Sequence, residues 1–126
     1  MENIRTIRTV DFAALRASAE RHTQRLLDRA SGGRTCQVSC IKTPPASGSP
    51  EGLHTHDVDQ LFYVLEGTMS IEVEGRTSEA GPGSLIVFPA GVPHRNWNAG
   101  QEATVHLSIA APMPDADAPF ATRVQA

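Results

Sequence analysis

The sequence of 126 residues contains only two cysteines and no long apolar run, and each scarcity excludes something. Cys36 and Cys40 are expected on one strand, where they lie about 13 Å apart. That separation exceeds the ~6 Å between Cα atoms that a disulfide needs, so we predict two reduced thiols that fill apolar space. A membrane-spanning helix needs roughly 20 apolar residues, and no segment approaches that length.

Strong charge of either sign is also missing. Fourteen acidic and eleven basic residues give a formal net charge of -3, so nothing predicts nucleic acid or an anionic membrane as a partner. The first residues include no apolar segment of the signal-peptide type, which predicts a cytoplasmic protein. The length fits one domain with a core of its own.

The amino-terminal part predicts a helix followed by strands. Asp11 is a suitable N-cap for an amphipathic helix over residues 12–30, which Gly32 and Gly33 would end. The apolar face of this helix consists of Phe12, Leu15, Ala19, His22 and Leu26. We therefore divide the chain into a helical extension (1–33), a barrel (34–111) and a proline-rich tail (112–126), which we expect to be an extended arm or disordered, with Phe120 as its anchor.

Most of the remaining chain predicts β-strands. Residues 68–74 and 104–110 alternate apolar and polar side chains, which is typical of half-buried strands. Residues 61–65 and 85–88 are apolar on both faces, so one face of each needs cover beyond the barrel interior. The amphipathic helix or a second subunit could supply this cover, and we expect a homodimer.

Three histidines stand in glycine- and proline-rich surroundings that indicate a metal site. His54 and His56 are two residues apart, so on a strand they project to the same side. His94 follows the later segment Pro89-Ala-Gly-Val-Pro, and a neighbouring strand could bring its ring to the other two. Three imidazole nitrogens on one face can bind a divalent ion and leave open positions for water or substrate.

The spacing of these residues resembles the two conserved motifs of the cupin superfamily. In that family, a glycine and five residues precede His-x-His, and a later segment contains Pro-x-Gly, a histidine and an asparagine. The matching positions here are Gly48, His54, His56, Gly67, Gly83, Pro89, Gly91, His94 and Asn98. The resemblance implies an all-β jelly-roll barrel (double-stranded β-helix), here with one amino-terminal helix, and one divalent metal per chain, which could be iron, zinc, nickel, manganese or copper.

Gln60 departs from the family motif, which usually has glutamate there. If the strand from His54 runs unbroken, Gln60 points to the same ion and serves either as a direct ligand or as a hydrogen-bond partner of a ligand or water. A neutral amide leaves the 2+ charge of the ion uncompensated and removes a possible general base. His106 shares a strand face with Thr104 and Ser108 and could replace that base, although a solvent-facing histidine is an equal alternative.

Three functions are consistent with these residues. The resemblance implies a small-molecule enzyme such as a non-haem metal-dependent dioxygenase. A redox-neutral Lewis-acid lyase, isomerase or cyclase is the alternative, and the uncompensated metal charge favours it. The third is a ligand-binding or sensing protein without turnover.

Overall fold

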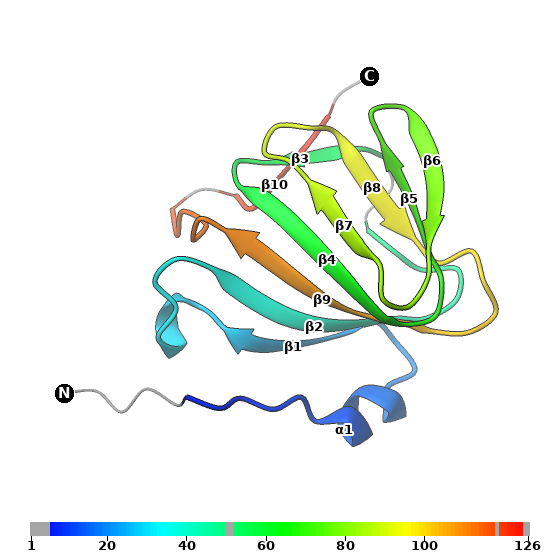
Figure 1. The fold of residues 1–126 in the computed structure, drawn as a ribbon, viewed down its shortest axis with the longest axis horizontal. Coiled ribbons are helices and arrows are strands. Elements are labelled where there is room, and N and C mark those ends of the chain that lie inside the picture. The colour runs from blue at the N-terminus through cyan, green and yellow to red at the C-terminus, as the bar shows by residue number, and fades with distance from the viewer. Residues whose placement is uncertain (1–5, 50–51, 118, 125–126) are drawn as a thin grey trace.

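The computed structural model describes residues 6–49, 52–117 and 119–124, and it shows two antiparallel five-stranded sheets that curve around a shared interior (Figure 1). The first five residues of the predicted extension, and residues 118 and 125–126 of the predicted tail, lie outside the described part. In spatial order the first sheet consists of β1 (His22–Leu27), β2 (Gln37–Thr43), β9 (Thr104–Ala111), β4 (Asp59–Glu66) and β7 (Leu85–Phe88). The second sheet consists of β10 (Ala121–Arg123), β3 (His54–His56), β8 (His94–Trp97), β5 (Met69–Val73) and β6 (Arg76–Ala80).

This architecture confirms the predicted all-β barrel with a small amino-terminal helix. Residues 85–88 form β7 as predicted, and the strands expected at 61–65, 68–74 and 104–110 lie within β4, β5 and β9 or extend past them by one residue. The strand expected from residue 34 begins at Gln37. No helix among the described residues is long and apolar enough to cross a membrane.

The predicted helix over residues 12–30 is wrong in its extent. Helix α1 spans only Phe12–Ala17, with the Asp11 carboxylate accepting a hydrogen bond from the amide of Ala14 at 3.0 Å. The backbone is extended at Ser18, and residues 22–27 pair with β2 as strand β1. Tertiary pairing with β2 therefore overrides the helical spacing of the apolar residues. His22 lies on this strand, and a short 3-10 helix (Arg29–Ser31) follows it.

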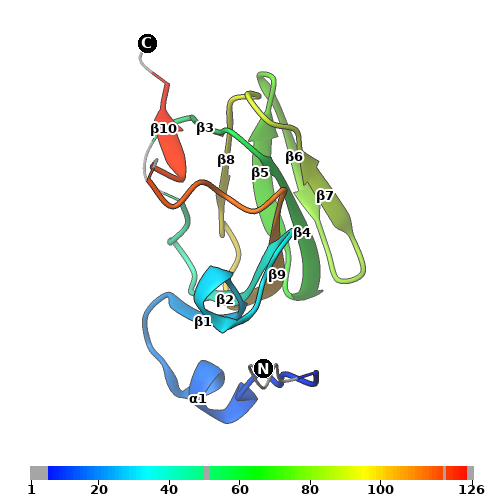
Figure 2. The same ribbon diagram turned by 90° about the vertical axis from the view of Figure 1, so that its left-hand side faces the viewer.

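Helix α1 covers part of the outer face of the first sheet (Figure 2). Leu15 is fully buried against Cys40 and Val105. Both cysteines are free thiols, as predicted, and Cys40 faces this outer cluster.

The outer face of β7 and the middle of the outer face of β4 have no such cover among the described residues, whereas Leu65 of β4 packs against the Leu15 cluster. Leu85 and Val87 are 59% and 49% exposed, and Tyr63, which pairs with Leu85, is 41% exposed. These exposed side chains explain why the sequence is apolar on both faces at residues 61–65 and 85–88. The homodimer stays a prediction.

The main apolar core lies between the two sheets. Phe62 and Phe88 meet edge to face, with ring centroids 5.0 Å apart. The cluster consists of Phe62, Val64, Met69, Ile71, Ala80, Ile86 and Phe88. It involves β4 to β7, while the histidines lie on β3 and β8, and two of the cavities are lined by residues of β1, β2, β3 and the tail.

The backbone geometry explains why two of the motif positions are glycine. Gly67 joins β4 to β5 with φ +77°, and a Cβ there would come within 2.6 Å of the Ala103 carbonyl oxygen. Gly48 forms a β-bridge with Trp97, and a Cβ would collide with the backbone at Asn96 and Trp97. Both positions therefore demand glycine for close backbone approach.

Asn98 has the structural role that its position in the motif predicts. Its side-chain amide nitrogen donates to the carbonyls of Thr43 (3.0 Å) and Glu102 (2.7 Å), and its oxygen accepts from the amide of Gly100 at 3.0 Å. The side chain is buried, so these bonds hold the β8–β9 connection against the end of β2.

Asn98→Ala is expected to lower the free energy of unfolding by about 2 kcal/mol, because two carbonyls and one amide lose their partner. Urea unfolding of the purified variant measures this loss. Asn96→Ala is the comparison, because Asn96 is equally buried but its amide nitrogen has no partner. If Asn98→Ala lowers the free energy of unfolding no more than Asn96→Ala does, the structural role of Asn98 is contradicted.

Candidate metal centre

The structure brings His54, His56 and His94 into one cluster. His54 on β3 pairs directly with His94 on β8, and His56 follows on the same side of β3. One potential ligand atom from each lies within 4.8 Å of the other two. His56 and His94 are 4% and 1% exposed, whereas His54 is half-buried. The cluster is thus reached from the side of His54.

Backbone carbonyls fix the orientation of the two buried rings. Nδ1 of His56 lies 2.9 Å from the Phe120 carbonyl oxygen, and Nδ1 of His94 lies 3.0 Å from that of Val92. A carbonyl only accepts, so each Nδ1 carries the proton and each Nε2 has a free lone pair. Both Nε2 atoms are buried and without a hydrogen-bond partner. This is the arrangement in which histidines bind metals.

The surroundings favour the neutral form of the His54 and His94 rings, which is the form that binds metal. Burial, with smaller contributions from the neighbouring His94, His56 and Arg21, lowers the pKa of His54 to about 4. Burial also lowers the pKa of His94. The three imidazoles place nitrogens close together, and two of the Nε2 atoms have no hydrogen-bond partner, so this cluster can hold a metal ion.

Phe120 is the residue of the tail that matters most here. Strand β10 pairs with β3, so the described part of the tail is an extended arm that returns to the histidines. Besides its carbonyl bond to His56, Phe120 places its ring 4.2 Å from the ring of His56. The sequence indicated Phe120 only as an anchor, and nothing in its surroundings signalled the contact with a histidine.

Gln60 reaches the barrel interior by a different path from the one that the sequence suggested. The chain does not run unbroken from His54, because β3 and β4 belong to different sheets and residues 57–58 form a bend between them. Gln60 is nevertheless buried and lines the same cavity as His54 and His56. Its amide nitrogen donates to Ser108 Oγ at 3.2 Å, which leaves Oε1 as an acceptor.

His106 faces the interior, as one of the two predicted alternatives has it, but lies apart from the histidine cluster. Its ring centroid is 4.2 Å from that of Phe62, Phe62 contacts Phe88, and Phe88 stacks on His94 at 4.1 Å. This row of ring contacts reaches His94 through two phenyl rings, and His106 is not among the residues whose ligand atoms gather in the cluster. It is fully buried and both ring nitrogens lack partners. The acid–base role stays a prediction, and this position gives it no support.

The buried His106 predicts a pH dependence of stability. Burial, with a smaller contribution from Arg21, lowers its pKa to about 3. Below pH ~6.5, His106 becomes protonated in the unfolded chain but stays neutral in the folded protein. The free energy of unfolding therefore falls as the pH drops from about 6.5 to 3. One histidine contributes a slope of up to about 1.4 kcal/mol per pH unit.

Metal-free His106→Leu should therefore lose less stability than the metal-free wild type between pH 7 and 5. Urea unfolding at each pH measures both slopes, and other titrating groups cancel in the comparison. Equal slopes would mean that His106 has the same pKa in the folded protein as in the unfolded chain, which contradicts the prediction.

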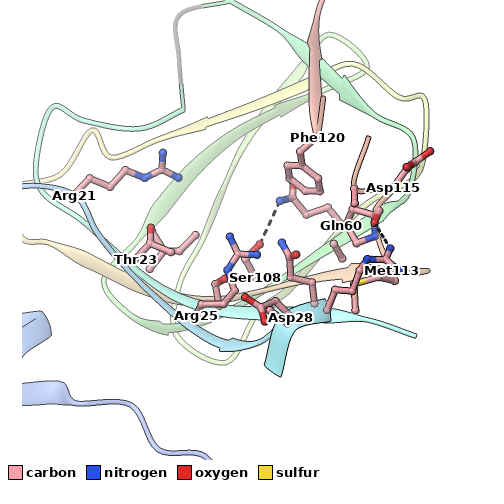
Figure 3. A pocket seen from close by; sticks show the side chains of 17 residues that line it. Arg21, Thr23, Arg25, Asp28, Gln60, Ser108, Met113, Asp115 and Phe120 are labelled. Atoms are coloured by element: carbon pink, nitrogen blue, oxygen red, sulfur yellow. Dashed lines mark hydrogen bonds between the residues drawn. The ribbon is translucent and has the colours of Figure 1, made fainter. Parts of the chain in front are cut away.

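Two cavities that share lining residues lie beside the cluster. The inner chamber, about 310 Å³, contains His54 and His56 and has a mainly apolar wall that includes Ile41, Phe62 and Phe120. The outer vestibule, about 600 Å³, is the space shown in Figure 3. Arg21, Ile41, Gln60 and Phe120 line both. The site therefore has an apolar chamber beside the histidines, and beside it a larger cavity, here called the vestibule, whose lining includes charged side chains.

An antiparallel jelly-roll barrel with a histidine cluster beside an interior chamber defines a class of β-barrels with a potential metal site. The model of the Cupin domain family matches residues 41–110, more than half of the chain. The protein therefore belongs to the cupin family, as the sequence motifs predicted.

Among curated relatives, a germin-like protein 8-14 of Oryza sativa is 37% identical over 79 residues, which cover 56% of this chain and 36% of that protein. The chain covers less than two thirds of each of the two curated relatives that it matches.

Solved structures with this fold include enzymes of different chemistry. The polyketide cyclase RemF from Streptomyces resistomycificus is 27% identical, with a TM-score of 0.71 over 86% of this chain and 73% of that one. The DMSP lyase DddQ from Ruegeria pomeroyi is 16% identical, with a TM-score of 0.68 over 94% of this chain and 60% of that one. At 16% identity, the likeness to DddQ shows only that the two proteins share a fold.

Proposed function

We propose that the protein is a metal-dependent enzyme acting on a small molecule, with one divalent ion held by His54, His56 and His94. The observation that carries this proposal is the pair of buried Nε2 atoms without partners, which converge with His54 on a chamber large enough for a small substrate. A bound ion would act as a Lewis acid, polarising a carbonyl oxygen or lowering the pKa of a bound water.

We further propose a redox-neutral reaction, such as cyclisation, isomerisation or elimination. No carboxylate or thiol among the described residues joins the three histidines, so the ligand set carries no negative charge. An uncompensated 2+ charge strengthens Lewis-acid behaviour and makes a ferrous ion harder to oxidise. The likeness to a polyketide cyclase supports this choice.

A dioxygenase is the second candidate function. Three histidine ligands leave open positions at which a redox-active metal could bind both substrate and dioxygen. Oxygen uptake by the iron-loaded protein, measured with phenolic and diketone substrates, separates the two candidates. Substrate-dependent uptake would overturn the redox-neutral proposal, whereas product formation by the zinc-loaded protein without uptake would support it.

Gln60 is proposed to be the neutral group beside the metal, either as a ligand through Oε1 or as a hydrogen-bond partner of a bound water. Gln60→Glu should retain the metal and lower the reduction potential of the iron-loaded protein by on the order of 100 mV, because an added negative charge nearby stabilises the more oxidised ion. Voltammetry measures the shift.

Gln37→Glu is the matched control, because Gln37 lies in the vestibule and not in the chamber. The reduction potential of the iron-loaded Gln37→Glu variant should change far less than that of Gln60→Glu. Equal shifts in the two variants would place Gln60 away from the metal.

A further inference from the structure

The vestibule contains a group of arginines that the sequence prediction had assigned to a helix. Residues directly opposite each other on paired strands share a face, and Arg25 on β1 is in register with Ser39 on β2, which is in register with Ser108 on β9. Ser108 receives the hydrogen bond from Gln60. Arg25 therefore stands on the interior face of the first sheet, in the same row as the partner of Gln60, and Figure 3 shows it directed into the cavity.

Arg21 connects this row to the inner chamber. It precedes β1 and lines both cavities, and its charge lowers the pKa of both His54 and His106. Its guanidinium extends into the space between the sheets (Figure 3). Neither Arg21 nor Arg25 forms a salt bridge with any residue that the structure describes.

The other charged groups around the two cavities do not neutralise these arginines. Asp28 acts electrostatically on Arg25, but its carboxylate also caps the amide of Ser31 at 2.9 Å. Asp115 accepts a hydrogen bond from the amide of Asp117. Arg29 donates to the Pro114 carbonyl, and Arg123 adds a further positive charge at the chamber. Among the residues that the structure describes, four arginines and two aspartates line the two cavities, beside a ligand set that carries no negative charge.

From this arrangement we infer that the natural ligand is a carboxylate-bearing small molecule with an apolar body, whose carboxylate is bound by Arg21 and Arg25 and whose body occupies the chamber beside the histidines. The inference rests on the proposed function, because it takes the chamber as the substrate site. Planar guanidinium groups match carboxylate geometry, and several positive charges around a concave site attract an anion. The apolar wall of Ile41, Phe62 and Phe120 favours a hydrocarbon or aromatic body.

The test compares two probes of equal size, 3-phenylpropanoate and 3-phenylpropanamide, by titration calorimetry on zinc-loaded and metal-free protein. A charge-assisted hydrogen bond predicts that the carboxylate binds about tenfold more tightly or better. Arg25→Gln and Arg21→Gln should each reduce this preference, and the double variant should abolish it. Arg76→Gln removes the same charge from the exposed strand β6, outside both cavities, and should leave the preference unchanged.

The preference should persist in metal-free protein, since the arginines and not the metal recognise the carboxylate. A preference that survives in the double variant but disappears with the metal would place the carboxylate on the ion and overturn the inference. Equal loss in Arg76→Gln, or no binding of the carboxylate at millimolar concentration, would overturn it as well.

Zinc measured in the same samples separates the two claims. An arginine-dependent preference in a protein that binds no metal would support the carboxylate site and contradict the proposed metal function. Bound zinc at one per chain without any carboxylate preference would support the proposed metal function and contradict the carboxylate site.

Discussion

His54→Ala is expected to lose metal affinity by at least ~100-fold while keeping the folded barrel. The substitution removes one of three nitrogens that converge on the ion, and loss of even an outer partner of a ligand costs roughly 10- to 100-fold. His54 is half-buried and does not belong to the apolar core between the sheets. Competition with a chromophoric zinc chelator measures the affinity, and thermal unfolding of the metal-free variant measures the fold.

His22→Ala is the matched control. His22 is also a half-buried strand histidine, but its ring contacts Gln24 and it lies outside the histidine cluster. It should retain full zinc affinity. Undiminished affinity in His54→Ala, or equal losses in the two variants, would show that the metal binds elsewhere.

Phe88→Ala is expected to lower the free energy of unfolding by about 3–5 kcal/mol, the usual cost of removing a buried phenyl ring. Phe88 is fully buried, meets Phe62 edge to face and stacks on His94 with only 15° between the ring planes. A typical domain has about 5–15 kcal/mol of stability, so the variant would lose a large share. Urea unfolding of metal-free protein gives the value without a contribution from ligand binding.

Leu85→Ala tests whether position on the strand decides this cost. Leu85 lies on the same strand but faces outward and is 59% exposed, so its truncation should change stability by less than about 0.5 kcal/mol. Similar losses at the two positions would contradict the assignment of inner and outer faces, or would show that a second subunit covers Leu85.

The sequence predicted the barrel and the three histidines because both depend on local patterns. Alternation along β5 and β9 distinguishes the two faces of each strand, and Gly67 marks a position where a Cβ would collide with the Ala103 carbonyl. The two-residue spacing of His54 and His56 fixes their common side. Only the approach of His94 required tertiary structure, and the family resemblance supplied it.

The cationic vestibule could not be predicted in this way. Apolar residues at helical spacing in the amino-terminal segment suggested one long helix, and pairing with β2 turned its second half into β1. A helical assignment hides the alternation that sends Thr23 and Arg25 to one face. The hydrogen bond between His56 and the Phe120 carbonyl could not be predicted either, because every residue has a backbone carbonyl and the sequence does not show which one lies near a histidine.

The isolation of His106 follows from side-chain packing that a strand pattern does not contain. Alternation placed it on one strand face with Ser108, and the structure shows that this face points into the barrel, where the ring of His106 contacts Phe62. His106 is not a member of the histidine cluster and lines neither cavity. Under the proposed function, proton transfer to a substrate in the chamber would fall to groups that line it, or to a water near Gln60.

X-ray diffraction from zinc-loaded crystals, collected on both sides of the zinc absorption edge, tests the central claim most directly. The account predicts one anomalous peak per chain, about 2.0–2.1 Å from Nε2 of His56 and of His94 and in contact with His54. Zinc located at another group of residues, or water molecules bridging the histidine nitrogens in the presence of excess zinc, would contradict it.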